Sequence, residues 1–312
     1  MGKHTAGTRR ESHRSWPRLL AAALALVVAA GALGYWAVSS RLLGRAAARA
    51  SPVATVVLPT PPPPVPPHHK VHFPTLALGA EGPAVLRLQQ LLAMTGYLPL
   101  TFNASSFRRH TIAPAWYTPI DPRVGTWSWT YWKTPARLRT LWTPGVDTVM
   151  VKGAVMTFEY VHGMPTDGIA GPAVWKALIA AAKRGKTDPY VYSWVLVSQT
   201  LPQKLTLWQG GKVVLVTPVN TGIPQAPTQN GTWPVYARFL TTTMSGTDPS
   251  GHHYSDPGVP WVSYFNGGDA VHGFLRASYG FPQSLGCVEL PYANAKVAFG
   301  HMTYGTLVTV IP

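Results

Sequence analysis

The sequence of 312 residues contains a single cysteine, Cys287, and few acidic side chains. One cysteine excludes an internal disulfide bond, so the surroundings of this thiol become informative. Aspartate and glutamate together number 11, against 26 lysines and arginines. The 31 prolines and 29 glycines are typical of loops, turns and linkers, and they argue against a protein built from long helices.

The net charge of +15 belongs to the front of the chain. Residues 1–74 hold nine basic side chains and one acidic one, residues 75–186 hold twelve and five, and residues 187–312 hold five of each. A basic exterior of this kind suits an anionic membrane surface or an anionic polymer at least as well as nucleic acid. The sequence shows no recognition-helix or aromatic-basic strand motif, so we expect no nucleic-acid partner.

An uncharged apolar run extends from Leu19 to Val38, after a basic segment. Twenty helical residues at ~1.5 Å each span the ~30 Å hydrocarbon core of a bilayer. We therefore predict a basic cytoplasmic tail over residues 1–18, a single transmembrane anchor over 19–38, and the remaining chain outside. A cleaved signal peptide is the alternative, since Ala48-Arg49-Ala50 loosely resembles a cleavage site.

Residues 39–74 predict a linker, because their second half reads SPVATVVLPTPPPPVPPHHKVHFP. Proline at this density favours an extended polyproline II conformation of ~3.1 Å per residue. Such a spacer would hold the following domains away from the membrane. Its histidines could bind a metal weakly, but we interpret the segment as a solvated linker.

Residues 75–186 predict a small helical domain. One helix is expected to begin after Gly82-Pro83 and to end at Gly96, and two more are expected within residues 147–182. The segments GAEGPAVLRLQQLLAMTGYL and VKGAVMTFEYVHGMPTDGIAGPAVWKAL resemble the three-helix peptidoglycan-binding domain found beside many cell-wall enzymes. A tryptophan-rich insertion at about residues 102–146 interrupts the resemblance; its aromatics could stack on sugar rings or cap the small core.

Residues 187–312 contain short runs of residues that favour β-strands. Strands are expected at residues 191–198, 204–209, 212–220, 233–240, 261–265 and 306–311, and one helix at residues 291–302. Many short strands separated by turn signals predict an antiparallel sandwich or barrel. The predicted fold class is thus multidomain: a transmembrane helix, an all-α three-helix domain with an insertion, and a mainly-β C-terminal sandwich.

Within this segment, VHGFLRASYGFPQSLGCVELP places His272 fifteen residues before Cys287. A thiolate is a competent acyl acceptor when an imidazole takes its proton. Gly286 permits a sharp backbone approach, amides near the cysteine could face a developing oxyanion, and Ser284 could orient groups in the same turn. From the residues alone, a buried unreactive cysteine and a structural histidine remain an alternative.

The same segment resembles the signature of the L,D-transpeptidase (YkuD-type) family, H-G-x(13–17)-S-x-G-C-x-x-L. The matching positions are His272, Gly273, Ser284, Gly286, Cys287 and Leu290. A second family feature lies upstream, at Thr221-Gly222 and at Thr228 to Gly231, with Gln229 in place of the family's proline. The resemblance covers about residues 190–312. It implies a β-sandwich-like catalytic domain and a two-step acyl transfer on peptidoglycan stem peptides.

The resemblance also implies a role for each matching residue. Cys287 would attack the donor tetrapeptide and expel D-alanine, and His272 would act first as base and then as acid. The carbonyl of Gly273 would orient the imidazole, amides of Gly286 and Cys287 would form the oxyanion hole, and Ser284 would support the histidine side of the turn. An amine of a neighbouring stem, or water, would then resolve the thioester. Acylation by carbapenems is characteristic of the family.

Two departures from the family pattern concern substrate binding. Glu289 stands where many members carry arginine, which reverses the charge where an anionic stem would be held, and Leu285 stands where a basic residue is frequent. Tyr254 and Tyr264 are candidate substrate-binding aromatics, although core packing is the alternative for both. We expect no cofactor and no metal, because His252-His253 has no third ligand at a suitable spacing.

These observations predict an enzyme of the bacterial cell envelope that is anchored to the cytoplasmic membrane and cross-links peptidoglycan outside it. The alternatives are an L,D-carboxypeptidase, which uses water as the acceptor, and a non-catalytic wall-binding protein.

Overall fold

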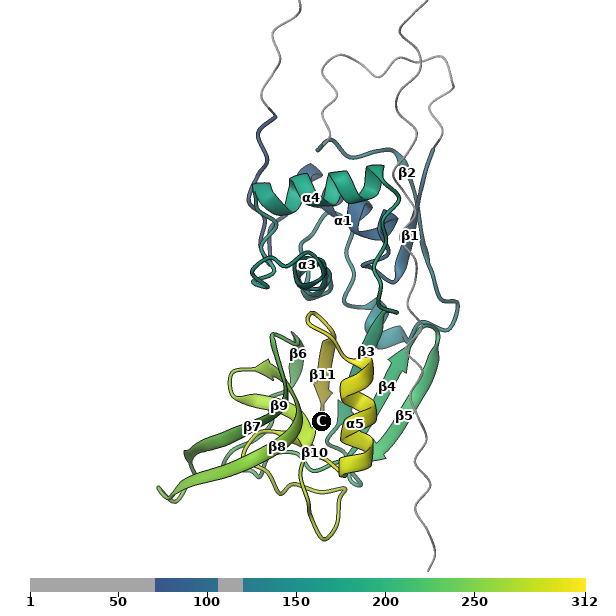
Figure 1. Ribbon diagram of the computed structural model, residues 1–312. Helices are drawn as coiled ribbons and strands as arrows, with labels where there is room; N and C mark the ends of the chain where they lie inside the picture. Colours follow the sequence, from purple (N-terminus) through teal and green to yellow (C-terminus); the bar gives the residue numbers. More distant parts are fainter. Residues whose placement is uncertain (1–70, 106–119) are drawn as a thin grey trace, which may run out of the picture. The chain divides into compact units, whose positions relative to one another are not determined.

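The computed structural model of the chain describes residues 71–105 and 120–312 (Figure 1). The predicted tail (1–18), the predicted anchor (19–38) and most of the predicted linker (39–74) lie outside the described residues. Within the described ranges, no helix is both long enough and apolar enough to cross a membrane. All of the described residues belong to one compact unit, residues 66–312.

Three helices form the core of the first part of this unit. They are α1 (Pro83–Met94), α3 (Val149–Val161) and α4 (Pro172–Lys183). Prolines begin α1 and α4, where the missing N–H costs nothing, and Gly96 adopts a φ of 78° just after α1. The three helices expected from periodicity are confirmed.

The predicted insertion adds strands to this part, so the expectation of an all-α domain was wrong. Strands β1 (Leu100–Ala104) and β2 (Gly125–Trp129) pair antiparallel, and a short helix α2 (Ala136–Arg139) follows. The ring centroid of Trp127 lies 4.9 Å from that of Phe102 and 5.1 Å from that of Trp142. Trp127 and Trp142 pack against the helical core, whereas Trp132 is 82% exposed. Aromatic packing therefore holds the β1–β2 pair against the helices. Of the three tryptophans named here, Trp127 and Trp142 cap the helical core.

A five-stranded sheet forms the centre of the second part, in the order β5-β4-β3-β11-β6. Its strands are β3 (Ser193–Ser198), β4 (Lys204–Gln209), β5 (Lys212–Pro218), β6 (Gly231–Pro234) and β11 (Leu307–Ile311). The β3–β11 pair is parallel, and the other pairs are antiparallel.

A second sheet has four strands in the order β10-β9-β8-β7. They are β7 (Ala237–Thr247), β8 (His253–Asn266), β9 (Asp269–Gly273) and β10 (Val288–Leu290). The single strand predicted at residues 233–240 is in fact the end of β6 and the start of β7, in different sheets. Strands β9 and β10 were not predicted from the sequence.

The two sheets and helix α5 (Tyr292–His301) enclose one hydrophobic core, which confirms the predicted β-sandwich. Each sheet contains one parallel pair, so the expectation of purely antiparallel pairing was wrong. Val195 and Leu207 of the first sheet, Val271 and Leu290 of the second, and Ala298 of α5 all belong to this core. In Figure 1, α5 runs beside the strands at the yellow end of the colour scale.

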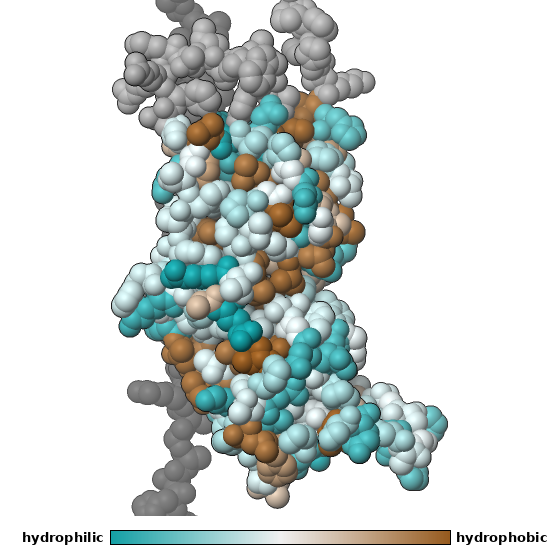
Figure 2. Space-filling view, turned by 180° about the vertical axis from the view of Figure 1, so that it is seen from behind, coloured by the Kyte–Doolittle hydropathy of each residue, from teal (hydrophilic) through white to brown (hydrophobic). Residues whose placement is uncertain are grey.

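The helical and β parts also share a core. Trp194, Trp208 and Leu307 of the five-stranded sheet belong to the same buried cluster as the helices. The Thr157 hydroxyl on α3 donates a hydrogen bond to the Tyr304 carbonyl oxygen over 2.9 Å. The boundary predicted near residue 187 therefore falls inside one packed unit, and its status as a domain boundary stays a prediction. On the face shown in Figure 2, hydrophobic residues form separate groups among polar ones.

Candidate active site

Alternation along two neighbouring strands brings the predicted catalytic residues to one face. Strands β9 and β10 pair in parallel, with Glu289 opposite His272. Val271, Val288 and Leu290 point into the sandwich core. Since successive side chains of a strand point to opposite faces, His272, Glu289 and the preceding Cys287 share the other face.

That face forms the floor of a pocket of about 710 Å³. The β7–β8 ribbon supplies one wall of the pocket, and the segment around Phe274 and Leu285 supplies another. Of the predicted site residues, the lining includes Cys287, His272, Ser284, Glu289, Tyr254 and Tyr264. Gly273 and Gly286 shape the backbone beside it.

The thiol of Cys287 is protonated at neutral pH. Burial raises its pKa to about 12, the carboxylates of Asp269 and Glu289 add to the shift, and a backbone hydrogen bond from Ala270 opposes it. The Sγ atom lies 3.8 Å from the carbonyl oxygen of Gly268, in the turn between β8 and β9. A thiol in this state reacts only when a base removes its proton.

His272 is suited to that task because it is neutral and held in one tautomer. The side chain is 2% exposed, and burial lowers its pKa. Its Nδ1 lies 3.1 Å from the Gly273 carbonyl oxygen, which can only accept a hydrogen bond. We therefore assign the proton to Nδ1, which leaves the lone pair of Nε2 as the proton acceptor.

Within the described part of the chain, no hydrogen bond joins the Cys287 thiol to the His272 imidazole. Catalytic hydrogen bonds are often long or poorly aligned in the free enzyme and tighten when substrate binds. Both groups line the same pocket, so one molecule bound there can contact both.

Ser284 and Gly286 shape the turn that carries Cys287. The Ser284 hydroxyl donates to the carbonyl oxygen of Cys287 over 2.6 Å and accepts from the Gly286 N–H over 3.3 Å. Ser284 thus holds the cysteine's own backbone, and its hydrogen bonds do not reach the imidazole. Gly286 has a φ of 118°, a conformation that side chains rarely adopt. Its amide is occupied by Ser284 in this state, so its role in an oxyanion hole stays a prediction.

The upstream Thr-Gly feature braces this turn from outside. The Thr228 hydroxyl donates to the Gly286 carbonyl oxygen over 2.7 Å and accepts from the Gly222 N–H over 2.9 Å. The backbone of Gly222 pairs with Ser284 as an isolated bridge. A Cβ on Gly222 would lie 2.1 Å from the Ala226 carbonyl oxygen, so only glycine fits there.

Sequence reasoning missed Arg276. Its Nε and Nη2 atoms donate to the two carboxylate oxygens of Glu289 over 2.8 and 2.7 Å. Glu289 therefore does not present an uncompensated negative charge, contrary to the expectation from its place in the motif. A basic residue four positions after His272 was the available signal, but the pairing depends on the strand register.

Three aspartates of the pocket were also missed, and two of them lie on neighbouring strands. Asp256 lies on β8, and Asp269 begins β9. Burial raises the pKa of Asp269 to about 6. Both are isolated polar residues in apolar or turn-like sequence, which gave no signal of a shared pocket.

Tyr254 and Tyr264 line the pocket from β8. Burial, followed by the proximity of Cys287, raises the pKa of both phenols. The ring of Tyr264 also lies near those of Tyr236 and Phe239, with centroids 6.1 Å away in each case. Tyr264 therefore combines packing with pocket lining. Leu285 gives the rim an apolar side chain, 37% exposed.

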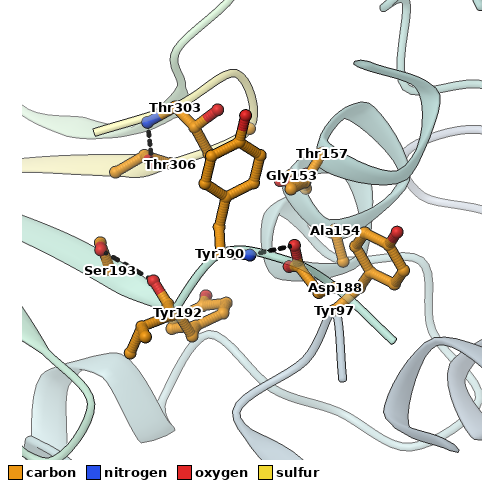
Figure 3. Close-up of a pocket in the computed structure, with 12 residues that line it drawn as sticks. Tyr97, Gly153, Ala154, Thr157, Asp188, Tyr190, Tyr192, Ser193, Thr303 and Thr306 are labelled. Atoms are coloured by element: carbon orange, nitrogen blue, oxygen red, sulfur yellow. Dashed lines mark hydrogen bonds between the residues drawn. The ribbon is translucent and has the colours of Figure 1, made fainter. Parts of the chain in front are cut away.

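A second cavity, shown in Figure 3, has a volume of about 20 Å³ and lies between α3 and the segment that enters β3. Asp188 accepts a hydrogen bond there from the Tyr190 N–H over 2.9 Å, and burial raises its pKa to about 6. The cavity has room for about one water molecule, so it is not a substrate site. Among the described residues, no three side chains of histidine, cysteine, aspartate or glutamate form a metal-binding group.

Residues 192–310 match the YkuD family, described as the L,D-transpeptidase catalytic domain. No match was found among curated proteins.

Several solved structures that are similar to part of the chain are L,D-transpeptidases. One from Mycobacterium smegmatis is 24% identical over 38% of this chain and 59% of its own, with a TM-score of 0.34. The catalytic domain of the Enterococcus faecium enzyme is 26% identical over 39% and 99%, with a TM-score of 0.35. L,D-transpeptidase 3 from Mycobacterium tuberculosis, with a faropenem-derived adduct, is 22% identical over 41% and 62%, with a TM-score of 0.35. The match to the first of these spans about three fifths of that protein's length.

Proposed function

We propose that this chain, which carries an L,D-transpeptidase catalytic domain over residues 192–310, is a peptidoglycan-modifying acyltransferase with Cys287 as its nucleophile. The observation that supports this most directly is the arrangement of Cys287 and His272 on one face of the β9–β10 pair, open to a single pocket. The neutral imidazole, with Nε2 as acceptor, meets the requirement of a thiol whose pKa is about 12.

The proposed reaction has two steps. Nε2 of His272 takes the thiol proton as Sγ attacks the carbonyl carbon that precedes the terminal D-alanine of a donor tetrapeptide stem. The C–N bond breaks, the imidazolium returns its proton to the departing amine, and D-alanine leaves. An amine of a neighbouring stem then attacks the thioester, His272 accepts the amine's proton, and the thiolate that leaves is reprotonated.

Three further features are proposals that rest on sequence. The helical part would bind peptidoglycan, the segment at residues 19–38 would anchor the chain in the cytoplasmic membrane, and the catalytic domain would lie outside that membrane. Hydrolysis of the thioester, as in an L,D-carboxypeptidase, is the competing outcome, because water reaches the same carbonyl carbon.

The first test is the intact mass of the protein from residue 66 onward after incubation with a carbapenem. A one-equivalent adduct is expected on the unmodified chain, none on Cys287→Ala, and a much slower one on His272→Ala. Circular dichroism and the unfolding temperature show that each variant is folded. A folded protein that forms no adduct under conditions that acylate another L,D-transpeptidase would count against a catalytic site and in favour of a wall-binding protein.

A second measurement separates amine from water. The protein is incubated with a tetrapeptide stem, with and without an added acceptor stem, and the products are analysed by mass spectrometry. A cross-linked dimer with release of D-alanine supports transpeptidation. Tripeptide alone in the presence of excess acceptor would identify a carboxypeptidase.

A further inference from the structure

The pocket around Cys287 contains more acidic than basic side chains. Four of the five acidic residues of segment 187–312 line it. Among the described residues of the lining, Arg276 is the one lysine or arginine. An anionic group of a substrate therefore has one cationic partner in this pocket.

Arg276 is held in a fixed orientation. Its Nε and Nη2 form a bidentate pair with Glu289, and its guanidinium carbon lies 4.6 Å from the ring centroid of Phe274. The Glu289 side chain is 5% exposed, whereas that of Arg276 is 30% exposed. Within the described part of the chain, no hydrogen bond engages Nη1. The two N–H groups of Nη1 thus remain as donors for a ligand. A planar guanidinium held in one orientation suits a carboxylate.

The offset along the chain between Cys287 and Glu289, the partner of Arg276, suits one amino-acid residue. Cys287 directly precedes β10, and Glu289 follows two positions later, about 6.6 Å along an extended chain. In a peptide, the next main-chain carboxyl group follows the scissile carbonyl by one residue, ~3.8 Å, and a charge-assisted hydrogen bond adds ~2.8 Å. A carboxylate one residue beyond the attacked carbonyl therefore reaches a guanidinium bound to Glu289.

We propose that Arg276 binds the C-terminal carboxylate of the residue that leaves during acyl transfer, with Glu289 orienting the guanidinium. The proposal rests on the proposed function, and it names the determinant of donor choice: a stem that ends one residue after the scissile bond with a free carboxylate. Arg276 lies in the segment between β9 and β10, and it thus supplies the positive charge that position 289 lacks.

The test compares two donor peptides that differ in one charge. Cys287→Ala protein, which cannot be acylated at this thiol, is titrated calorimetrically with a stem tetrapeptide ending in D-alanine and with its C-terminal amide. The expected result is at least tenfold tighter binding of the free acid. Loss of Arg276 alone would leave the buried Glu289 carboxylate unpaired, so the informative variant is R276Q/E289Q, which removes both charges.

In that double variant, the acid and the amide are expected to bind equally, at the affinity of the amide in the parent. The matched control E289Q keeps Arg276 and retains a preference for the acid. Equal binding of the two peptides to the parent, a loss of affinity shared equally by both in the double variant, or no binding of either peptide would overturn the assignment.

Release of D-alanine by the protein that retains Cys287 is measured separately. Release without a preference for the acid in the binding assay overturns the role of Arg276 and leaves the proposed function standing. A preference for the acid that is lost with Arg276, without release, overturns the proposed function and leaves the carboxylate site.

Discussion

The hydroxyl of Thr228 donates a hydrogen bond to the carbonyl oxygen of Gly286, 2.7 Å away and 58 residues later in the chain. Thr228 is buried, and its hydroxyl also accepts from the Gly222 N–H. This contact ties the residue before Cys287 to the loop between β5 and β6. The position of Cys287 thus depends on a residue that lies outside the pocket lining.

Replacement of Thr228 by valine should slow acylation of Cys287. Valine keeps the shape but leaves the Gly286 carbonyl and the Gly222 N–H without this partner, at a cost of about 1–3 kcal/mol for each buried group. We expect a lower unfolding temperature and an adduct rate with a carbapenem reduced by roughly tenfold, since ~1.4 kcal/mol in the barrier is a factor of ten. Thr228→Ser retains the hydroxyl and is the matched control. A valine variant that acylates as fast as the serine variant would show that the brace does not position the nucleophile.

Gly286 is the position in this turn where a side chain is least tolerated. A Cβ there would lie 2.3 Å from Oδ1 of Asp269, and the φ of 118° is strained for any other residue. Gly286→Ala should destabilise the protein by about 1–3 kcal/mol, measured by urea unfolding, and should abolish carbapenem acylation.

The matched control for this change is Gly300→Ala. Gly300 lies in α5, where a Cβ would meet nothing within 4 Å. Alanine in a helix is favoured over glycine by up to about 1 kcal/mol, so this variant should be as stable as the parent or more so. If Gly286→Ala retained the stability and acylation rate of Gly300→Ala, the turn would have to be more adaptable than its geometry indicates.

The negative charge of Asp269 should restrain the reactivity of Cys287. Burial is the main cause of the raised thiol pKa, and Asp269 is the first of the two carboxylates that add to it. Asp269→Asn removes that charge and should lower the thiol pKa. Far below the pKa, each unit of decrease raises the thiolate fraction about tenfold. We therefore expect iodoacetamide to alkylate the variant roughly threefold to tenfold faster at pH 8.

The pH dependence checks the cause. Asp269 itself has a pKa of about 6, so below that pH it is protonated in the parent, and the two rates should converge. Asp248→Asn makes the same charge change at the far end of the pocket wall and should leave the rate within about twofold of the parent. Equal acceleration by both variants would assign the effect to the overall charge of the pocket.

The sequence predicted the helices and most strands better than it predicted the charged contacts of the candidate site. Apolar periodicity located α1, α3 and α4, and a proline at the first position also marked the start of α1 and of α4. Strand β10 was missed because three residues, Val288 to Leu290, are too short for an alternating pattern to be recognised. The parallel pairing of β10 with β9 places His272 on the same face of the sheet as Cys287. The spacing of the two residues in the chain alone cannot reveal that register.

The ion pair of Glu289 could not be predicted for the same reason. Its charge is visible in the sequence, but its partner is thirteen residues away across a loop. Whether a charge faces substrate or an ion pair depends on tertiary contacts. Asp256 and Asp269 likewise line the pocket from β8 and β9, and their proximity depends on the pairing of these strands.

The buried carboxyl of Glu159 on α3 should make the stability of the protein depend on pH. Glu159 is 1% exposed and accepts a hydrogen bond from the Gly168 N–H over 2.9 Å. Burial, opposed by backbone hydrogen bonds and reinforced by Asp167, raises its pKa from 4.5 to about 8. Because the folded state binds this proton more tightly than the unfolded state, the contribution of Glu159 to stability is full below about pH 4.5 and is lost as the pH rises through about 8.

Glu159→Gln mimics the protonated form and cannot titrate. At pH 4 it should match the parent, and at pH 9 it should be more stable by up to about 5 kcal/mol, since each pKa unit corresponds to ~1.4 kcal/mol. The measurement is the free energy of unfolding in urea between pH 4 and pH 9. Glu81→Gln, an exposed carboxylate before α1, controls for loss of one negative charge and should change the pH profile little. A Glu159→Gln protein whose stability falls with pH as steeply as that of the Glu81→Gln control would mean that Glu159 ionises in the folded state without penalty, and that the hydrogen bond from Gly168 offsets its burial.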